Sequence, residues 1–154
     1  MTMSEPAIVD LQPATVAVIR ATIPMNSIRD FYDRGFGEVA GVLAAQGVAP
    51  SGPALGIYWG VPTDTIELAC GFPITRPITV EGRVTMEELP TGRAAQAVHV
   101  GPYEGLSDTY AQLADWVAAQ GRSLGAMMWE SYETEPTPEA DPESMRTRIT
   151  WPLA

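Results

Sequence analysis

The sequence contains no lysine, so all nine of its basic residues are arginine. This absence excludes chemistry that depends on a lysine amine: a Schiff base, a pyridoxal-phosphate linkage, a Walker-type phosphate site and a Ser-Lys hydrolase dyad. The 19 acidic residues outnumber the basic ones and give a formal net charge of -10. Because such a surface repels polyanions, we expect no direct contact with nucleic acid or with an anionic membrane.

Cysteine and histidine are equally scarce, since Cys70 and His99 are the only residues of their types. One of each cannot form a zinc finger, a CxxC redox pair, an intrachain disulfide or an HExxH site. No stretch approaches the roughly 20 apolar residues of a membrane-spanning helix, and the first residues lack the basic and apolar regions of a secretion signal. We therefore expect no metal, no cofactor and a soluble cytoplasmic protein.

The chain is long enough for one ordinary domain, because 154 residues with 45% hydrophobic content can bury a substantial core. Hydrophobic periodicity predicts similar elements in both halves. The first half is expected to form a strand at 15–22, a helix at 28–47 and strands at 55–60 and 65–72. After a linking strand at about 80–89, the second half is expected to form a strand at 93–100, a helix at 106–121 and strands at 126–133 and 145–151.

Short identities support an internal duplication. The run Ala-Ala-Gln-Gly ends both expected helices, at 44–47 and again at 118–121, and Gly-Phe-Pro-Ile at 71–74 matches Thr-Trp-Pro-Leu at 150–153. After an N-terminal segment at 1–14, we predict one domain at 15–154 with repeats at 15–74 and 91–153. Two βαββ units give an α+β fold, a curved and mostly antiparallel sheet with both helices on one face. A ligand cleft between the repeats is expected on the other face, and the proline-rich stretch 134–144 is expected to be a loop.

The strand predicted near 126–133 carries the first candidate for chemistry. Side chains alternate along a strand, so Met128, Glu130 and Tyr132 share one face and Trp129 lies on the other. A carboxylate on such an apolar ribbon is costly to desolvate unless it is paired, hydrogen-bonded or contacts a cationic ligand. Glu130 is therefore the leading candidate, and an edge-strand glutamate that reaches water or an arginine is the alternative interpretation.

Aromatic residues gather around this strand and its counterpart in the first half, at Tyr58, Trp59 and Tyr103 besides Trp129 and Tyr132. Aromatic faces around one carboxylate favour a flat or cationic organic molecule, although each ring could instead belong to the core. His99 alternates with two valines, and no GxSxG nucleophile motif accompanies it. We therefore expect a hydrogen-bonded structural histidine rather than a catalytic base.

Several runs, taken together, resemble the GyrI-like small-molecule-binding family, which occurs alone or as the effector-binding part of AraC- and MerR-type multidrug regulators. They are HVGPYEGLSDTYAQLADW from His99, GPALGIYW from Gly52, ELACGFPI from Glu67, WESY from Trp129 and TRITWPL from Thr147. The resemblance covers about 15–153. It implies a duplicated βαββ fold with a cleft between the halves, where Glu130 faces a cationic or amphipathic compound and Tyr132 and neighbouring aromatics line the pocket.

The resemblance leaves three functions open. The favoured one is a domain that senses or sequesters amphipathic, cationic or aromatic small molecules, with Glu130, Tyr132, Trp129, Trp59, Tyr58, Tyr103 and Met128 as the ligand-binding residues. Because some stand-alone relatives look like hydrolases of cyclopropane-bearing natural products, the second is a hydrolase with Glu130 as its catalytic residue. The third is a protein-interaction module such as a gyrase modulator. Fourteen residues before the first expected strand are too few for a helix-turn-helix, so a transcriptional role would need another protein.

Overall fold

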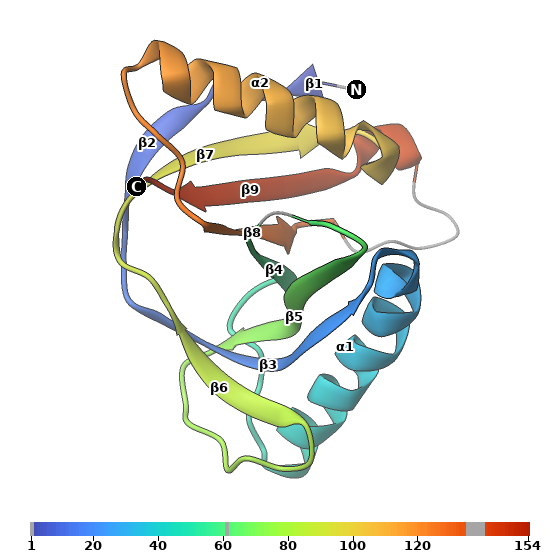
Figure 1. Cartoon of the computed structure of the whole chain (residues 1–154). Helices are drawn as coiled ribbons and strands as arrows, with labels where there is room; N and C mark the ends of the chain where they lie inside the picture. The colour runs from blue at the N-terminus through green and yellow to red at the C-terminus, as the bar shows by residue number, and fades with distance from the viewer. Residues whose placement is uncertain (1, 61, 135–140) are drawn as a thin grey trace. The chain divides into compact units, whose positions relative to one another are not determined.

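The chain divides into two compact units. The computed structural model describes residues 2–60, 62–134 and 141–154. The first unit is Gln12–Thr91, and the second unit combines Met1–Leu11 with Gly92–Ala154. Each unit contains an antiparallel sheet and one long helix (Figure 1). The predicted α+β class is confirmed.

The first unit follows the order strand, helix, strand, strand, with one further strand at its edge. Its elements are β3 (Ala14–Pro24), the 3-10 turn η1 (Met25–Ser27), α1 (Ile28–Ala45), β4 (Leu55–Trp59), β5 (Thr65–Ile74) and β6 (Val84–Leu89). Within the sheet the strands lie in the order β4-β5-β3-β6, and every pairing is antiparallel. The linking strand predicted from the sequence is thus β6, which pairs with β3.

The second unit repeats this order. Its elements are β7 (Gly92–Val100), the 3-10 turn η2 (Tyr103–Gly105), α2 (Leu106–Ala119), β8 (Met127–Tyr132), the 3-10 turn η3 (Pro142–Ser144) and β9 (Arg146–Pro152). Strand β9 lies between β7 and β8. The stretch 134–144 was predicted to be a loop; residues 135–140 of it lie outside the described residues, and η3 occupies its end.

Two short strands precede β3 and were not predicted. Strands β1 (Thr2–Met3) and β2 (Ala7–Leu11) pair with β7, far away in the sequence. The run Ala-Ile-Val-Asp-Leu is short and lies between two prolines, so local pattern alone gives no strand signal. The strands exist because the free edge of β7 offers unpaired backbone groups, which is a long-range property.

The duplication extends to side-chain packing. In the first unit Phe36 of α1 contacts Phe72 of β5 edge-to-face, with ring centroids 5.9 Å apart. In the second unit Tyr110 of α2 contacts Trp151 of β9 in the same way at 6.2 Å. Both pairs join the helix to the last strand of the repeat, so the two units bury corresponding aromatic contacts as well as following one order of elements.

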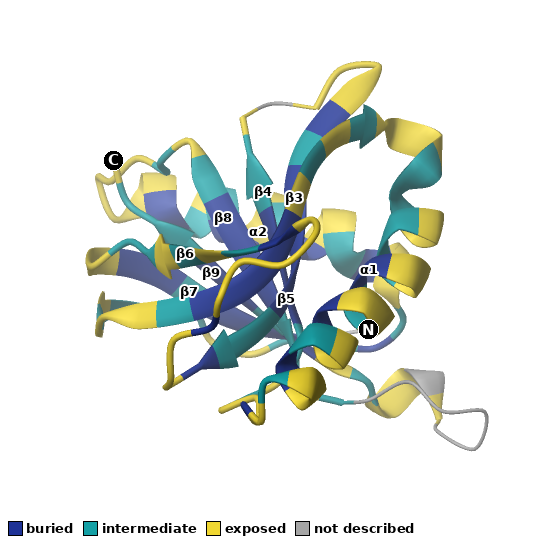
Figure 2. Ribbon diagram, turned by 90° about the horizontal axis from the view of Figure 1, so that it is seen from below, coloured by how far each residue is buried: buried dark blue, intermediate teal, exposed yellow. Residues whose placement is uncertain are grey.

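Helix α1 packs closely on its sheet at one glycine. A Cβ atom on Gly35 would overlap the Sγ atom of Cys70, so no larger residue fits there without movement. Around this contact the buried core includes Ile19, Val39 and Leu43, and β3 and β5 contain long buried stretches (Figure 2). Burial raises the pKa of the Cys70 thiol to about 12, so this cysteine is a core residue and not a nucleophile.

The other glycines of α1 allow a stability test. A Cβ atom on Gly41 meets nothing within 4 Å, and alanine favours a helix interior over glycine by about 1 kcal/mol. We expect Gly41→Ala to raise the free energy of unfolding by about 0.5–1 kcal/mol in urea denaturation. Gly35→Ala is the matched control and should lower it, because its Cβ meets Cys70. A loss of stability in Gly41→Ala would contradict the open environment of that position.

Among the helices of the described ranges, none combines the length and the apolar character needed to cross a membrane.

Candidate functional site

Glu130 on β8 is the one carboxylate that is buried among the described residues. Only 4% of its surface is exposed. The hydroxyl of Tyr132 donates a hydrogen bond to its Oε1 atom at 2.7 Å. A desolvated carboxylate is stable only with hydrogen-bond donors or positive charge nearby, so this contact stabilises the ionised form. The strand therefore holds an acidic group inside the protein with a phenol beside it.

Tyr103 adds a second ring to this group. It begins η2, and its ring contacts that of Tyr132 edge-to-face, with centroids 5.9 Å apart. Burial, and secondly the charge of Glu130, raise the pKa of the Tyr103 hydroxyl above its ordinary value. Tyr103 itself remains 40% exposed. Glu130, Tyr132 and Tyr103, here called the Glu130 cluster, thus extend from a buried carboxylate to an aromatic ring at the surface.

The strand register assigns this cluster to one face of the second unit. Tyr132 lies opposite Thr147 of β9, and Thr147 lies opposite His99 of β7. His99 is hydrogen-bonded to Thr109 of α2, so these side chains point to the face that α2 covers. Met128 lies on the same face by the alternation of β8. Four of the residues predicted to bind a ligand therefore lie on the helix face: Tyr103, Met128, Glu130 and Tyr132. The ligand cleft that was expected on the opposite face of the sheet stays a prediction.

The side chain of Thr147 is a polar group that the sequence analysis did not single out. It is fully buried, and its Oγ1 atom has no hydrogen-bond partner among the described residues. Buried hydroxyls are normally hydrogen-bonded, so an unsatisfied one next to Tyr132 is unusual. The register of β8 and β9 places Thr147 beside Tyr132 of the Glu130 cluster. Nothing in the local sequence marks this threonine as a neighbour of the cluster.

The buried polar residues all belong to the second unit. Among the described residues they are His99, Thr109, Glu130, Thr147 and Thr150. Corresponding positions of the first unit follow from the Ala-Ala-Gln-Gly runs and from the strand registers. The matching residues, first unit then second, are Ala21 and His99, Gly35 and Thr109, Gly56 and Glu130, Tyr58 and Tyr132, and Leu68 and Thr147. The second copy therefore has polar side chains where the first copy has apolar residues or glycine, apart from the tyrosine that both contain.

His99 has the structural role that was predicted for it. Only 1% of its surface is exposed, and both ring nitrogens are hydrogen-bonded. The Nε2 atom lies 2.9 Å from the carbonyl oxygen of Pro102, and the Nδ1 atom lies 2.6 Å from the hydroxyl of Thr109. With both nitrogens engaged, His99 offers no lone pair for proton abstraction from a substrate.

The two aromatic residues predicted in the first unit lie on different faces of its sheet. Tyr58 forms a hydrogen bond with the hydroxyl of Tyr32 on α1, so it lies on the helix face. Trp59 lies on the other face, where the guanidinium of Arg20 is 3.8 Å from its ring centroid. Glu67 holds that guanidinium through an ion pair of 2.7 Å. The cation against Trp59 in this structure is therefore the chain's own arginine.

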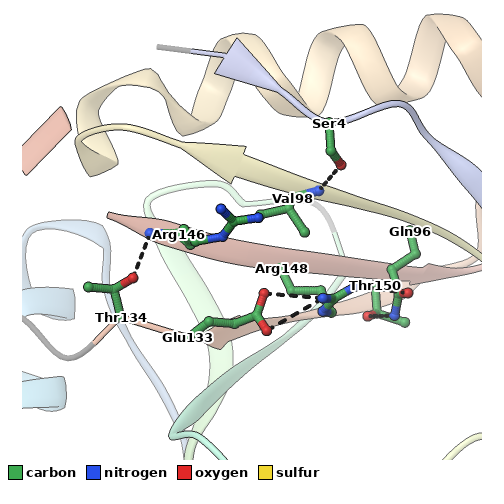
Figure 3. A network of polar contacts seen from close by, with 8 residues as sticks. All are labelled: Ser4, Gln96, Val98, Glu133, Thr134, Arg146, Arg148 and Thr150. Carbon is green, nitrogen blue, oxygen red and sulfur yellow. Dashed lines mark hydrogen bonds and ion pairs between the residues drawn. The ribbon is translucent and has the colours of Figure 1, made fainter. Parts of the chain in front are cut away.

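Trp129 lies on the face of β8 opposite to Glu130 and is 6% exposed. Its cross-strand neighbour is Thr150, whose hydroxyl accepts a hydrogen bond of 3.0 Å from Gln96. Figure 3 shows this polar network, in which Arg148 forms an ion pair of 3.3 Å with Glu133. The structure thus separates Trp129 from the Glu130 cluster, and its predicted ligand contact stays a prediction.

The Glu130 cluster combines one carboxylate with aromatic rings. Within the described residues no three histidine, cysteine, aspartate or glutamate side chains gather where they could hold a metal ion. A single buried carboxylate with two tyrosine rings instead offers a negative charge and aromatic faces, which attract an organic cation.

The chain matches a known protein family and several solved structures. A family model described as a GyrI-like small molecule binding domain matches residues 4–154. No curated protein matches the chain at a significant level. Among solved structures, the C-terminal domain of EcmrR is similar with a TM-score of 0.81 and 20% identity, over 97% of each chain. In the EcmrR-DNA complex the similarity has a TM-score of 0.81 with 21% identity; it covers 97% of this chain but 57% of the EcmrR chain.

Two further similar structures are a complex with a small molecule and a hydrolase. The structure of SAV2435 bound to tetraphenylphosphonium has a TM-score of 0.65 and 15% identity, and the match covers 97% of this chain and 94% of that one. A hydrolase from Listeria innocua has a TM-score of 0.66 and 14% identity, and the match covers 97% of this chain and 92% of that one. At these identities the similarity establishes the shared fold.

Proposed function

Because the chain belongs to the GyrI-like small-molecule-binding family, we propose that it binds amphipathic aromatic cations at the Glu130 cluster. The observation that carries this proposal is the carboxylate of Glu130, which is 4% exposed and lies beside the rings of Tyr132 and Tyr103. A carboxylate in a low-dielectric environment attracts a cation more strongly than one in water does. Aromatic faces add cation-π attraction and apolar contact for the organic part of the molecule.

The neighbours support the class of ligand and the kind of role. SAV2435 shares the fold and binds tetraphenylphosphonium, a lipophilic cation surrounded by four phenyl rings. EcmrR carries its similar domain at the C-terminus of a protein that binds DNA. We propose that the present domain senses or sequesters such cations, and that with a net charge of -10 it makes no direct contact with DNA.

A pair of ligands with matched shape and opposite charge tests this function. Tetraphenylphosphonium and tetraphenylborate both present four phenyl rings, so a purely hydrophobic site would bind both. We expect calorimetry with the full chain to show tighter binding of the phosphonium, because the borate would bring a second negative charge to Glu130. Equal affinity for the two ions, or tighter binding of the borate, would overturn the proposal.

A hydrolase is the second candidate function, and similarity to the Listeria innocua hydrolase favours it. In that case Glu130 would orient or deprotonate a water molecule against an electrophilic carbon held between the aromatic rings. Incubation with a cyclopropane- or epoxide-bearing substrate, followed by mass spectrometry, distinguishes the two functions. Conversion by the wild type that is absent in Glu130→Gln would favour the enzyme, and recovery of unchanged substrate would favour the binding domain.

A further inference from the structure

The turn between β7 and α2 brings Tyr103 into the Glu130 cluster. Gly101 has a φ of 129°, in the region where residues with a side chain are strained, and its N–H donates a hydrogen bond of 2.8 Å to Met145. Pro102 follows with a φ of -61°, which its ring fixes. Glycine and proline therefore shape the turn, and the N–H of Gly105 in η2 donates a hydrogen bond of 3.1 Å to the Pro102 carbonyl.

The ring of His99 adds a second, side-chain hydrogen bond to the Pro102 carbonyl. A carbonyl oxygen can only accept, so the contact of 2.9 Å with Pro102 requires a proton on Nε2. In the neutral ring Nδ1 is then the acceptor, and the hydroxyl of Thr109 donates to it at 2.6 Å. One buried imidazole thus joins strand β7 to the turn that precedes Tyr103 and to Thr109 at the end of the first turn of α2.

The first unit forms its connection from strand to helix without such a polar pair. In the first unit Pro24 precedes η1, as Pro102 precedes η2 in the second unit. Met25 begins η1, as Tyr103 begins η2. The residues that match His99 and Thr109 are Ala21 and Gly35, which have no side-chain hydrogen-bonding groups. The connection from strand to helix forms there without them and leads into a longer helix, since α1 has 18 residues and α2 has 14, so the polar pair is a feature of the second unit.

We propose that His99, acting with Thr109, is a positioning residue of the ligand site: it fixes the Pro102 carbonyl so that the ring of Tyr103 stays against Tyr132 beside Glu130. The inference rests on the proposed function, since Tyr103 matters to a ligand only if the Glu130 cluster binds one. His99 itself does not contact the ligand, and its effect passes through the turn and the ring of Tyr103.

Two substitutions of His99 test its hydrogen bonds to Pro102 and to Thr109 separately. The amide of glutamine extends to about the position of Nε2, so His99→Gln can still donate to Pro102. The shorter amide of asparagine lies near the position of Nδ1, so His99→Asn keeps a partner for Thr109 and loses Pro102. If the proposal is right, glutamine rescues the site and asparagine does not. Thr109→Val removes the hydroxyl that bonds His99 and preserves the shape of the side chain, so it should disturb the position of the imidazole less than His99→Asn does.

The first readout needs no ligand. Burial and the charge of Glu130 raise the pKa of Tyr103, so release of its ring should lower that pKa toward the ordinary value. The resonances of ¹³Cζ-labelled tyrosine can be followed through a pH titration, with Tyr103 assigned by Tyr103→Phe. We expect a lower Tyr103 pKa in His99→Asn, a smaller decrease in Thr109→Val, and the wild-type value in His99→Gln. An unchanged Tyr103 titration in folded Thr109→Val and His99→Asn would overturn the proposal.

The second readout is affinity for tetraphenylphosphonium. We expect His99→Asn to weaken binding roughly fivefold, since the ligand must then order a loosened side chain, and His99→Gln to stay within about twofold of the wild type. Urea unfolding of each variant identifies any general loss of structure. If wild-type protein fails to bind the phosphonium, the proposed function fails, whereas the Tyr103 titration still decides whether His99 positions the ring. Equal weakening by asparagine and glutamine would contradict the role of the Pro102 hydrogen bond.

Discussion

Glu130→Gln should weaken the binding of tetraphenylphosphonium by about 1–3 kcal/mol, or roughly 5- to 150-fold in dissociation constant. The substitution removes the negative charge and keeps nearly the same volume. Glu130 is 4% exposed, so its charge is poorly screened by water and contributes more to a bound cation than a surface charge does. The amide oxygen of glutamine can still accept the hydrogen bond from Tyr132, so the free energy of unfolding should change little.

A second variant separates this local effect from the overall acidity of the protein. Glu133 lies just beyond β8 and forms an ion pair with Arg148, so Glu133→Gln removes the same formal charge from a more exposed position. We expect the affinity for the phosphonium to change less than about twofold in this control, because salt screens exposed charges. Calorimetry should be carried out on both variants at the same ionic strength. Equal affinity of wild type and Glu130→Gln would rule out the carboxylate as the cation contact.

Gly71→Ala should destabilise the first unit by about 3 kcal/mol or more, the upper range for an overpacked core. Gly71 lies in β5, between its register partners Val18 of β3 and Leu55 of β4. A Cβ atom there would overlap the carbonyl oxygen of Ala17 and lie 2.9 Å from the Cα atom of Val18. These are backbone atoms of a paired strand, so they cannot move aside without breaking the β3–β5 hydrogen bonds.

Urea unfolding followed by circular dichroism measures this effect. The comparison variant is Gly41→Ala, which adds the same methyl group where nothing lies within 4 Å and should be stabilising. Opposite signs for the two substitutions would show that close packing, and not the loss of a glycine as such, determines the cost. An unfolding midpoint of Gly71→Ala equal to that of the wild type would contradict the close approach of β3 and β5 at this position.

Periodicity in the sequence predicted the elements of each repeat closely. The alternating side chains of 65–72 and 126–133 and the helical spacing before Gly47 and Gly121 are local properties, and they appear as β5, β8, α1 and α2. The Ala-Ala-Gln-Gly runs indicated the duplication in the same way. Strands β1 and β2 could not be predicted, because they pair with the edge of β7, far away in the sequence, and their own residues carry no strand pattern.

The candidate site was likewise predictable in part from local sequence patterns. That Met128, Glu130 and Tyr132 share a face follows from alternation in one strand, and the hydrogen-bonded role of His99 followed from its place between valines and the absence of a nucleophile motif. Their part in ligand binding stays a prediction. The sequence could not indicate Thr109 and Thr147, because a threonine acquires such a role only through neighbours on other elements.

Local sequence patterns indicated the order of the elements within each repeat, the duplication, and the family resemblance that the family model confirms, because each depends on residues close together in the chain or on repeated runs. Which side chains contact one another depends on the folded chain. The registers of β7, β8 and β9 bring His99, Thr147 and Tyr132 into one row, and the turn before α2 places Tyr103 against Tyr132. Such contacts join residues far apart in sequence, so no local pattern encodes them.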